Sequence, residues 1–226
     1  MSQAAGWPLV QDLPGVLPTR QRRSQETTVA LLEAGAELLG DCAFDELSID
    51  ELCRRVGVTI GAFYGRFESK DAFFAALMAL AAKRCLAAID EAVAKDDRTH
   101  AELEKVCRDL VAVVVTDVIR RNEGVLRAAM QYKAVQPARW ITVRETGSGI
   151  VERSMPLLLA RMGPGRKEAK TQTIAFAFQM VFGTLLTAVQ NKPKHVGLHD
   201  REMIDRLALA MFLQLDHEAK AGRRAK

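Results

Sequence analysis

The sequence predicts an all-α protein, and three observations lead to that prediction. Apolar residues recur at steps of three and four from Gln25 onwards, which is the spacing of an amphipathic helix. Helix-start signals precede several of these runs, and glycine or proline follows them. No stretch shows a convincing strand alternation, and the β-branched run 111–115 lies between helical flanks. With 49% apolar residues in a chain of 226, such helices can bury a sizeable core.

The N-terminal part predicts a leader followed by a first helix. Residues 1–18 contain three prolines and show no periodicity, so we expect a disordered leader. The first helix begins near Gln25, and Gly40-Asp41 ends it, because a glycine past the last turn readily stops a helix. Residues 19–69 are then expected to form the first domain.

Two short helices and one long helix follow. Residues 48–51, with the sequence Ser-Ile-Asp-Glu, form a capping box at the start of the first short helix. Gly57 breaks the chain, and Thr59 caps the second short helix. Ser69 caps the long helix and places Asp71 in its first turn, where the positive helix end favours an acid.

The remainder, residues 70–218, is expected to be a second, entirely helical domain, followed by a basic tail at 219–226. Its expected helix at 137–162 is interrupted by Gly147-Ser148-Gly149 and by Pro156, which leaves open whether the proline kinks or ends it. The other expected helices cover residues 102–121, 123–135, 167–190 and 199–220.

Charge and cysteine usage narrow the class of protein. The net charge of +4 is too small to indicate nucleic-acid binding by itself, and residues 19–71 hold seven basic against ten acidic residues. The four cysteines have no zinc-site spacing, although a redox-sensor role for Cys42 or Cys53 stays open. The first residues lack the pattern of a signal peptide, and no run of 18 apolar residues exists. We therefore expect a cytoplasmic protein without a membrane span.

The two short helices joined at Gly57 are typical of a helix-turn-helix, whose second helix enters the major groove of DNA. On a helical wheel Ile60, Phe63 and Phe67 share one face, which is expected to pack on the other helices. The opposite face holds Gly61, Ala62 and Gly65, which carry almost no side chain. Each glycine costs about 1 kcal/mol relative to alanine inside a helix. The pattern therefore predicts a backbone that approaches base edges closely; alternatively, Gly65 merely loosens a frayed helix.

Residues of phosphate-contacting types surround this bare face. Tyr64 and Arg66 flank it, and Thr59 and Lys70 lie at its two ends. Ser48 begins the preceding helix, where unpaired N–H groups attract an anion. Three arginines before the first helix form a basic arm that could reach a phosphate or a minor groove: Arg20, Arg22 and Arg23.

The segments "ALLEAGAELLGDCAFDE" and "LSIDELCRRVGVTIGAFYGRFESKDAFFAAL" resemble the N-terminal domain of the tetracycline-repressor (TetR) family of bacterial transcription factors. The resemblance covers roughly residues 22–80. It implies an N-terminal three-helix DNA-binding domain and a C-terminal helical bundle for ligand binding and dimerisation.

The resemblance also implies roles for single residues. Ser48 and Thr59 would anchor phosphates, and Tyr64 and Lys70 would grip the DNA backbone. Four residues would face the groove: Ile60, Gly61, Ala62 and Gly65. Because Ile60 and Gly65 replace the polar, basic or aromatic residues of many members, specificity is expected to come more from thymine-methyl contacts, Arg66, the arm and DNA shape.

The rest of the chain supplies weaker candidates. Residues 173–189 are apolar nearly all round, which predicts burial against both their own domain and a partner chain. The expected homodimer interface comprises Phe182, Gly183, Leu186, Leu207 and Met211; alternatively, both last helices are plain core. The expected ligand-binding residues are Arg127, Met130, Tyr132, Trp140, Met155 and Phe178, with Arg127 or Arg144 meeting an acidic group.

No metal site, cofactor or catalytic pair is expected. His195 and His199 lie in a loop, which does not fix two imidazoles as a helix would. The sequence therefore predicts a non-enzymatic, homodimeric DNA-binding regulator, a repressor that a small apolar or amphipathic ligand releases from a palindromic double-stranded operator. The alternatives are a small-molecule carrier or enzyme-like bundle with a vestigial head, and a nucleoid protein, against which the acidic head argues.

Overall fold

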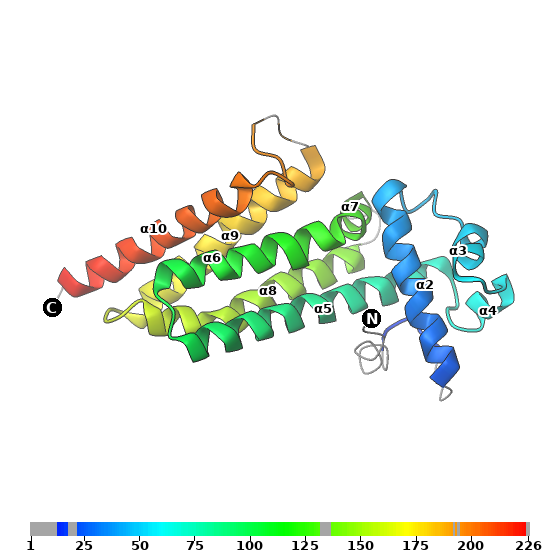
Figure 1. The fold of residues 1–226 in the computed structure, drawn as a ribbon, viewed down its shortest axis with the longest axis horizontal. Helices are drawn as coiled ribbons and strands as arrows, with labels where there is room; N and C mark the ends of the chain where they lie inside the picture. Colours follow the sequence, from blue (N-terminus) through cyan, green and yellow to red (C-terminus); the bar gives the residue numbers. More distant parts are fainter. Residues whose placement is uncertain (1–12, 18–21, 132–136, 192, 194, 225–226) are drawn as a thin grey trace. The chain divides into compact units, whose positions relative to one another are not determined.

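The computed structural model describes residues 13–17, 22–131, 137–191, 193 and 195–224. Most of these residues are helical, and none of them lies in a named strand (Figure 1). The all-α prediction is confirmed. The helices are α2 (Arg22–Asp41), α3 (Ile49–Val56), α4 (Ile60–Tyr64), α5 (Lys70–Thr99), α6 (Leu103–Val113), α7 (Glu123–Gln131), α8 (Pro137–Arg161), α9 (Lys167–Asn191) and α10 (Glu202–Arg224).

Most helix bounds lie close to those expected from the sequence, with two informative differences. The expected helix at 102–121 is α6 followed by a π-helical turn, Val114–Ile119, and a 3-10 turn, Arg120–Asn122. Helix α8 runs unbroken through Gly147–Gly149 and through Pro156, which is exposed, so the proline neither ends the helix nor separates two.

The chain divides into two compact units. The first comprises the described residues up to Arg84 together with Asn122–Val143, and the second comprises Cys85–Arg121 and the described residues from Arg144 onwards. The first half of α5 thus belongs to the unit that contains the short helices, whereas the sequence placed the domain boundary at residue 69.

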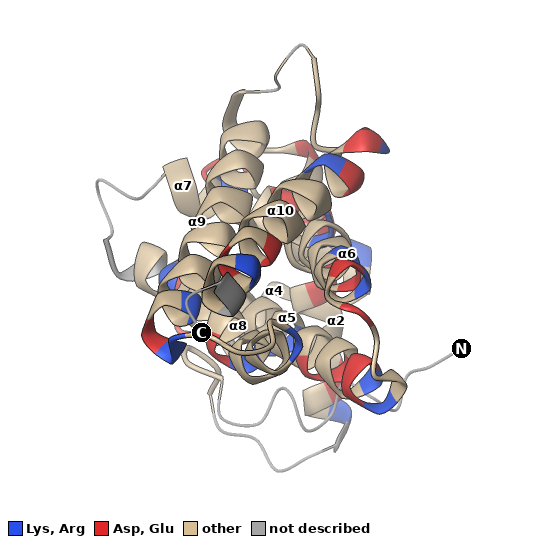
Figure 2. Ribbon diagram, turned by 90° about the vertical axis from the view of Figure 1, so that its left-hand side faces the viewer, with Lys and Arg blue, Asp and Glu red and all other residues tan. Residues whose placement is uncertain are grey.

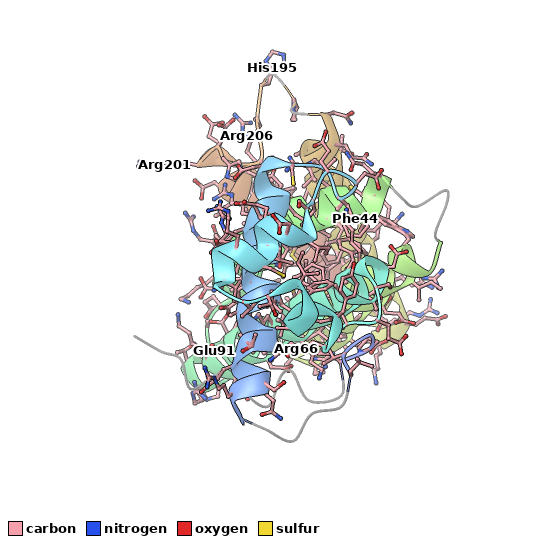
Figure 3. All side chains as sticks on the ribbon, turned by 90° about the vertical axis from the view of Figure 1, so that its right-hand side faces the viewer. Phe44, Arg66, Glu91, His195, Arg201 and Arg206 are labelled. Atoms are coloured by element: carbon pink, nitrogen blue, oxygen red, sulfur yellow. The ribbon has the colours of Figure 1, made fainter. Side chains whose placement is uncertain are left out.

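An aromatic cluster forms the core of the first unit. The rings of Phe63, Phe67 and Phe73 are fully buried, with centroids 5.1–5.5 Å apart. Beside them Phe44 and Phe74 pack with ring centroids 4.6 Å apart. Figure 3 shows Phe44 within a dense group of side chains. Aromatic pairs at such distances contribute beyond their buried area, so this cluster fixes α4 and the start of α5 on α2.

Helix α7 closes the first unit against the C-terminal end of α2. A Cβ on Gly124 would lie only 2.2 Å from the carbonyl oxygen of Leu39, so glycine permits this close approach. The guanidinium of Arg127 donates to the carbonyls of Gly40 at 2.8 Å and Leu39 at 3.3 Å, which would otherwise be unpaired at the helix end. Arg127, expected to meet a ligand, is therefore occupied as a cap of α2.

In the second unit α10 packs on both α6 and α9, and the buried faces of these helices form its core. By length and composition α5 and α9 could each cross a membrane, but the core helices of soluble proteins pass the same test. The criterion applied to the sequence, 18 consecutive apolar residues, did not reveal the high mean hydropathy of these two helices.

A buried carboxylate lies near the end of α5. Asp96 is 1% exposed, and among the described residues neither of its carboxylate oxygens accepts a hydrogen bond. Its nearest cation is the ammonium of Lys105, 3.5 Å away, which also pairs with Asp109. Burial, and next the negative charge of Asp109, raises the pKa of the Asp96 carboxyl above its ordinary value of 3.8.

Asp96→Asn is therefore expected to raise the free energy of unfolding at neutral pH by about 1 kcal/mol, because the neutral amide removes the charge of a buried group without hydrogen-bond partners among the described residues, whose burial costs about 1–3 kcal/mol or more. Between pH 3.8 and the raised pKa the native state holds a proton that the unfolded state has lost, so wild-type stability falls as pH rises through this window. Asparagine does not titrate, so the advantage of the variant should shrink on acidification.

Urea unfolding at a series of pH values measures this difference. The matched control is Asp97→Asn, because Asp97 is the exposed neighbour and its closest cation, Arg161, is 3.9 Å away. A less stable Asp96→Asn protein at neutral pH would show instead that attraction to Lys105 outweighs the cost of burial.

Candidate nucleic-acid interface

The helix-turn-helix is built by three local caps. Ser48 accepts from the N–H of Glu51 at 3.3 Å and starts α3, although the Glu51 carboxylate pairs with Arg54 instead of closing the capping box. Gly57 ends α3 with φ of +74°, a left-handed conformation that side chains disfavour. Thr59 then accepts from the N–H of Ala62 at 3.1 Å and starts α4. The turn predicted at Gly57 is present.

Helix α4 has a buried face and an exposed face. Phe63 and Phe67 point into the aromatic cluster, as the wheel predicted. Ile60 was placed on the packed face by the wheel but is 45% exposed, because it is the first residue of the helix and lies beyond the cluster. Tyr64 is 50% exposed. Two large side chains thus stand in solvent on a helix of five residues.

Of the two glycines at this helix, Gly61 is not required by the packing of the described residues. A Cβ on Gly61 would meet only the Thr59 hydroxyl, at an ordinary contact distance of 3.8 Å. Gly65 has φ of −72°, which any residue adopts, although a Cβ there would approach the carbonyl oxygen of Gly61 to 3.3 Å. An alanine at Gly61 would fit, so its bare surface has no explanation inside the described structure.

Arg66 is turned into the protein rather than toward the exposed face. Its guanidinium donates to the carbonyl of Ala62 at 2.5 Å and to the carbonyl of Ser24, in the first turn of α2, at 3.3 Å. Partial burial lowers the pKa of the guanidinium from its ordinary value. In Figure 3 Arg66 lies beside α2, and in this arrangement it joins two helices instead of reading bases.

Lys70 also has a partner within the chain. Its ammonium donates to the carbonyl of Asp45 at 3.0 Å and lies 4.8 Å from the ring centroid of Phe44. These contacts tie the first turn of α5 to the segment before α3. The sequence predicted that Lys70 contacts the DNA backbone. For that contact the ammonium would have to bind DNA in addition to the Asp45 carbonyl, or give up the contact with that carbonyl.

The remaining DNA-contact candidates lie on the surface or outside the described residues. Ser48, Thr59 and Arg23 are exposed, and Ala62 is half-buried. Arg20 and the side chain of Arg22 lie outside the described part of the chain. The acidic excess of the head is partly offset locally, since three of its acids pair with arginines: Glu33 with Arg84, Glu37 with Arg55, and Glu51 with Arg54.

The expected ligand residues are divided between the two units. Arg127, Met130 and Trp140 belong to the first, and Met155 and Phe178 belong to the second. Tyr132 lies outside the described residues. Phe178 is buried and stacks on Phe182, with ring centroids 6.0 Å apart, so it serves the core of its unit. Their role in ligand binding stays a prediction.

Two residues of the expected dimer interface are buried within their own unit. Leu207 and Met211 face inward on α10, so their place on the exposed side is taken by Leu209 and Leu213, each 54% exposed. On α9 Phe176 is 52% exposed, Phe182 and Leu186 are half-buried, and Gly183 is exposed with open space around it. The assignment of a dimer interface to α9 and α10 stays a prediction, and the exposed apolar residues of α10 are Leu209 and Leu213 instead of the two that were predicted.

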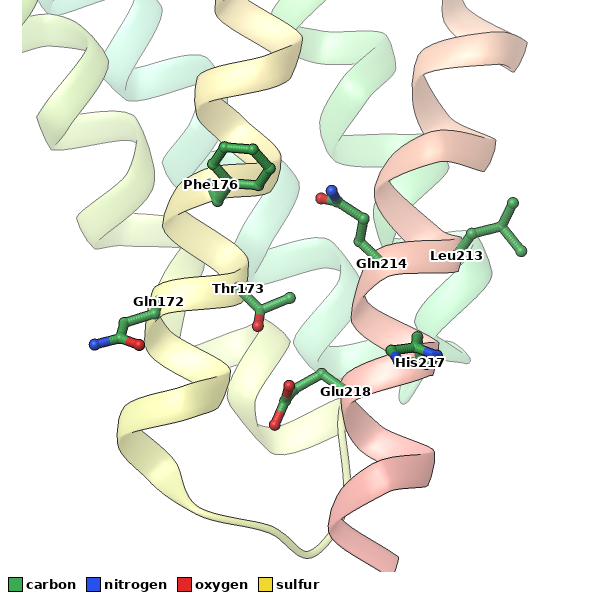
Figure 4. Close-up of a pocket in the computed structure, with 7 residues that line it drawn as sticks. All are labelled: Gln172, Thr173, Phe176, Leu213, Gln214, His217 and Glu218. Atoms are coloured by element: carbon green, nitrogen blue, oxygen red, sulfur yellow. The ribbon is translucent and has the colours of Figure 1, made fainter.

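A shallow groove of about 640 Å³ runs between the same two helices (Figure 4). Phe176 and Leu213 line it together with polar residues from both helices: Gln172 and Thr173 of α9, and Gln214, His217 and Glu218 of α10. None of these was expected to bind a ligand. The sequence gives little indication that these residues line a groove, because isolated exposed apolar residues are normal on any protein surface.

The histidines and cysteines are the side chains on which metal or thiol chemistry would depend. No cluster of three metal-ligating side chains occurs among the residues that the structure describes, and His195 and His199 are exposed. Burial raises the pKa of the Cys85 and Cys107 thiols to about 12. Burial likewise raises the pKa values of Cys42 and Cys53, which disfavours the reactive thiolate that a redox sensor needs.

Comparison with known proteins shows which family the segment with the two short helices resembles. Residues 31–77 match the sequence profile of bacterial regulatory proteins of the tetR family. The uncharacterized HTH-type transcriptional regulator YwcC of Bacillus subtilis is 38% identical over 58 residues, 26% of each chain. The A-factor receptor protein of Streptomyces griseus is 36% identical over 59 residues, 26% of this chain and 21% of that protein. These matches span about a quarter of the relatives' lengths.

The likeness of fold extends over most of the chain. A TetR-family transcriptional regulator from Mesorhizobium loti superimposes with a TM-score of 0.70, covering 89% of this chain and 98% of that one, at 15% sequence identity. At so low an identity the likeness concerns the fold. The matched helix-turn-helix therefore sits in a chain whose helices follow the same arrangement.

Proposed function

Because the chain belongs to the TetR family through its N-terminal helix-turn-helix, we propose that it is a sequence-specific DNA-binding transcriptional regulator. The observation that carries this proposal is the exposed face of α4, where Gly61 stands open between the exposed side chains of Ile60 and Tyr64. An unneeded glycine on a surface lets a backbone approach a partner closely. The major groove of DNA is wide enough to admit an α-helix, so it is a partner that this face could approach.

The proposed contacts with DNA divide into two kinds. Tyr64, Thr59, Ser48 and Arg23 would contact phosphates and fix the position of the head, because hydroxyls, guanidinium groups and helix N-termini suit phosphate oxygens. Ile60 and its small neighbours would meet thymine methyl groups. Since direct hydrogen bonds to bases are few in this arrangement, we propose that DNA shape carries part of the specificity.

We propose that the protein acts as a homodimer joined through α9 and α10. The charged residues of α9 are confined to its first turns, so the rest of the helix is tan in Figure 2. The exposed side chains of Phe176, Leu209 and Leu213 and the open surface at Gly183 supply an apolar face for a second copy. A two-fold dimer would present two heads to a palindromic operator, with their spacing set by the dimer.

We further propose that residues 70–218 respond to a small apolar or amphipathic effector that releases the protein from DNA, which makes it a repressor. The relative from Streptomyces griseus is named as a receptor for A-factor, which supports a signal-responsive role by analogy. An effector that moves the population from 1:99 to 99:1 must prefer the released state by about 5.5 kcal/mol. In this role the protein would work in the cytoplasm, without enzymatic activity and without a cofactor.

Selection of DNA from a random-sequence pool at near-physiological salt tests the proposal. The wild type should enrich a two-fold-symmetric site, and Tyr64→Ala should lose it or bind it at least tenfold more weakly. Because Tyr64 is half exposed, the variant should keep the fold, which circular dichroism checks. Absence of enrichment, or equal enrichment by both proteins, would contradict sequence-specific binding through α4.

A further inference from the structure

The first five described residues form a turn that packs on the helix-turn-helix. In Leu13-Pro14-Gly15-Val16 the N–H of Val16 donates to the carbonyl of Leu13 at 3.3 Å, and Gly15 has φ of +80°. Proline followed by a glycine with positive φ is the signature of a type II turn. Leu13 is buried in the core of the first unit, so the segment is part of the fold and not the disordered leader that the sequence predicted. We call residues 13–17 the strap.

The strap is attached at both ends of the connection between α4 and α5. The N–H of Leu17 donates to the carbonyl of Arg66 at 2.7 Å, and Val16 pairs with Phe67 in an antiparallel bridge. At the other end Gly15 lies against the first turn of α5, where an added Cβ would be 2.2 Å from the carbonyl oxygen of Ala72. The strap therefore covers the exit of the recognition helix.

Arg66 connects the strap to two helices. Its backbone carbonyl holds Leu17, while its side chain reaches Ala62 in α4 and Ser24 in the first turn of α2. Both acceptors are backbone carbonyls, and the rigid fork of the guanidinium serves them with two different nitrogens, Nη1 for Ala62 and Nε for Ser24. Three parts of the chain thus share one residue: the strap, the recognition helix and the N-terminal turn of α2 beside Arg23.

From this geometry we propose that the strap, acting through the positioning residue Arg66, holds α4 at a fixed angle to α2 and thereby sets how the recognition helix enters DNA. Helix α4 needs such a support, because five residues are too few for a helix to be stable alone. The DNA-binding half of the inference rests on the proposed function; the support of α4 does not.

Gly15→Ala in the full chain tests the support directly. The substitution strains the positive φ and collides with the backbone at Ala72, and it touches no residue of the exposed face. Hydrogen–deuterium exchange of the free protein should show the α4 amides exchanging at least tenfold faster than in the wild type. Gly40→Ala is the matched control, since a Cβ at Gly40 has open space within 4 Å.

A second variant, Arg66→Lys, keeps the charge but loses the fork that reaches both Ala62 and Ser24. It should show the same fast exchange of α4. If α4 exchanges at the wild-type rate in either variant while circular dichroism shows an intact fold, the strap and Arg66 do not support the recognition helix and the inference is wrong.

The DNA half is tested on the site that the wild type selects. Gly15→Ala should bind it about tenfold more weakly than Gly40→Ala does, with an unchanged slope of log affinity against log salt, because the strap carries no charge. Equal affinity would overturn the role in binding. If the wild type selects no site, the proposed function fails, and the exchange experiment still decides whether the strap supports α4.

Discussion

Phe63→Ala is expected to lower the free energy of unfolding of the first unit by about 3–5 kcal/mol, the usual cost of removing a buried phenylalanine ring. The ring of Phe63 is fully buried and touches three others: its centroid lies 5.1 Å from that of Phe67, 5.2 Å from that of Tyr64 and 5.5 Å from that of Phe73. Folded proteins are stable by only about 5–15 kcal/mol. The helix-turn-helix should therefore melt well below the rest of the chain in a thermal scan.

Tyr64→Ala is the matched control for this prediction, because the two residues are neighbours on opposite faces of α4. Tyr64 is half exposed and contacts Phe63 only edge to face, so its loss should cost less than about 1 kcal/mol. Both variants should lose specific DNA binding, but only Phe63→Ala should lose stability. Equal melting temperatures for the two variants would show that the aromatic cluster does not hold α4.

Gly61→Ala is expected to raise the stability of the protein while it weakens DNA binding. Alanine is favoured over glycine in a helix by up to about 1 kcal/mol, and a Cβ at Gly61 meets only the Thr59 hydroxyl at 3.8 Å. The variant should therefore unfold at a slightly higher urea concentration. Its added methyl group points to the face proposed for the groove, where it would keep the backbone from the bases and weaken binding of the selected site by about tenfold.

Gly40→Ala provides the same chemical change at a glycine with open surroundings outside α4. It should leave DNA affinity unchanged. If Gly61→Ala binds the selected site as tightly as Gly40→Ala does, the open surface of α4 is not the contact surface, and the explanation offered for its glycine is wrong.

The sequence predicted the local structure of the helix-turn-helix well because the signals are local. The caps at Ser48 and Thr59 and the left-handed turn at Gly57 each depend on residues three or four positions away. The burial of Phe63 and Phe67 follows from helix periodicity. Ile60 was misplaced because a wheel treats every residue as mid-helix, whereas Ile60 begins a helix too short to cover it.

The sequence could not predict where the long basic side chains lie. The acceptor of Arg66 on α2 is 42 residues away in the chain, and the acceptor of Lys70 is 25 residues away. A flexible arginine or lysine near a proposed DNA surface resembles a phosphate contact until the competing backbone carbonyls are known. The contacts of Arg127 were unforeseen for the same reason, since its acceptors at the end of α2 lie 87 and 88 residues away.

The strap was missed although a signal for it exists. Pro14-Gly15 is a strong turn dipeptide, but the surrounding prolines of residues 1–18 led to a prediction of disorder. The exposed face of α10 was misassigned because this helix carries apolar residues on two sides, and the sequence alone does not tell which side is buried. Burial of Leu207 and Met211 against the chain's own helices decides the phase, and only the packed structure supplies that information.

The contact of α7 with α2 has a consequence for the order in which the protein folds during synthesis. The carbonyl of Leu39 leaves the ribosome 88 residues before Arg127, the side chain that caps it. At 5–20 residues per second this interval lasts about 4–18 s. Throughout that time the helix that underlies the DNA-binding surface has an unfinished end, so the nascent chain gains a complete DNA-binding unit only after the middle of the polypeptide has emerged.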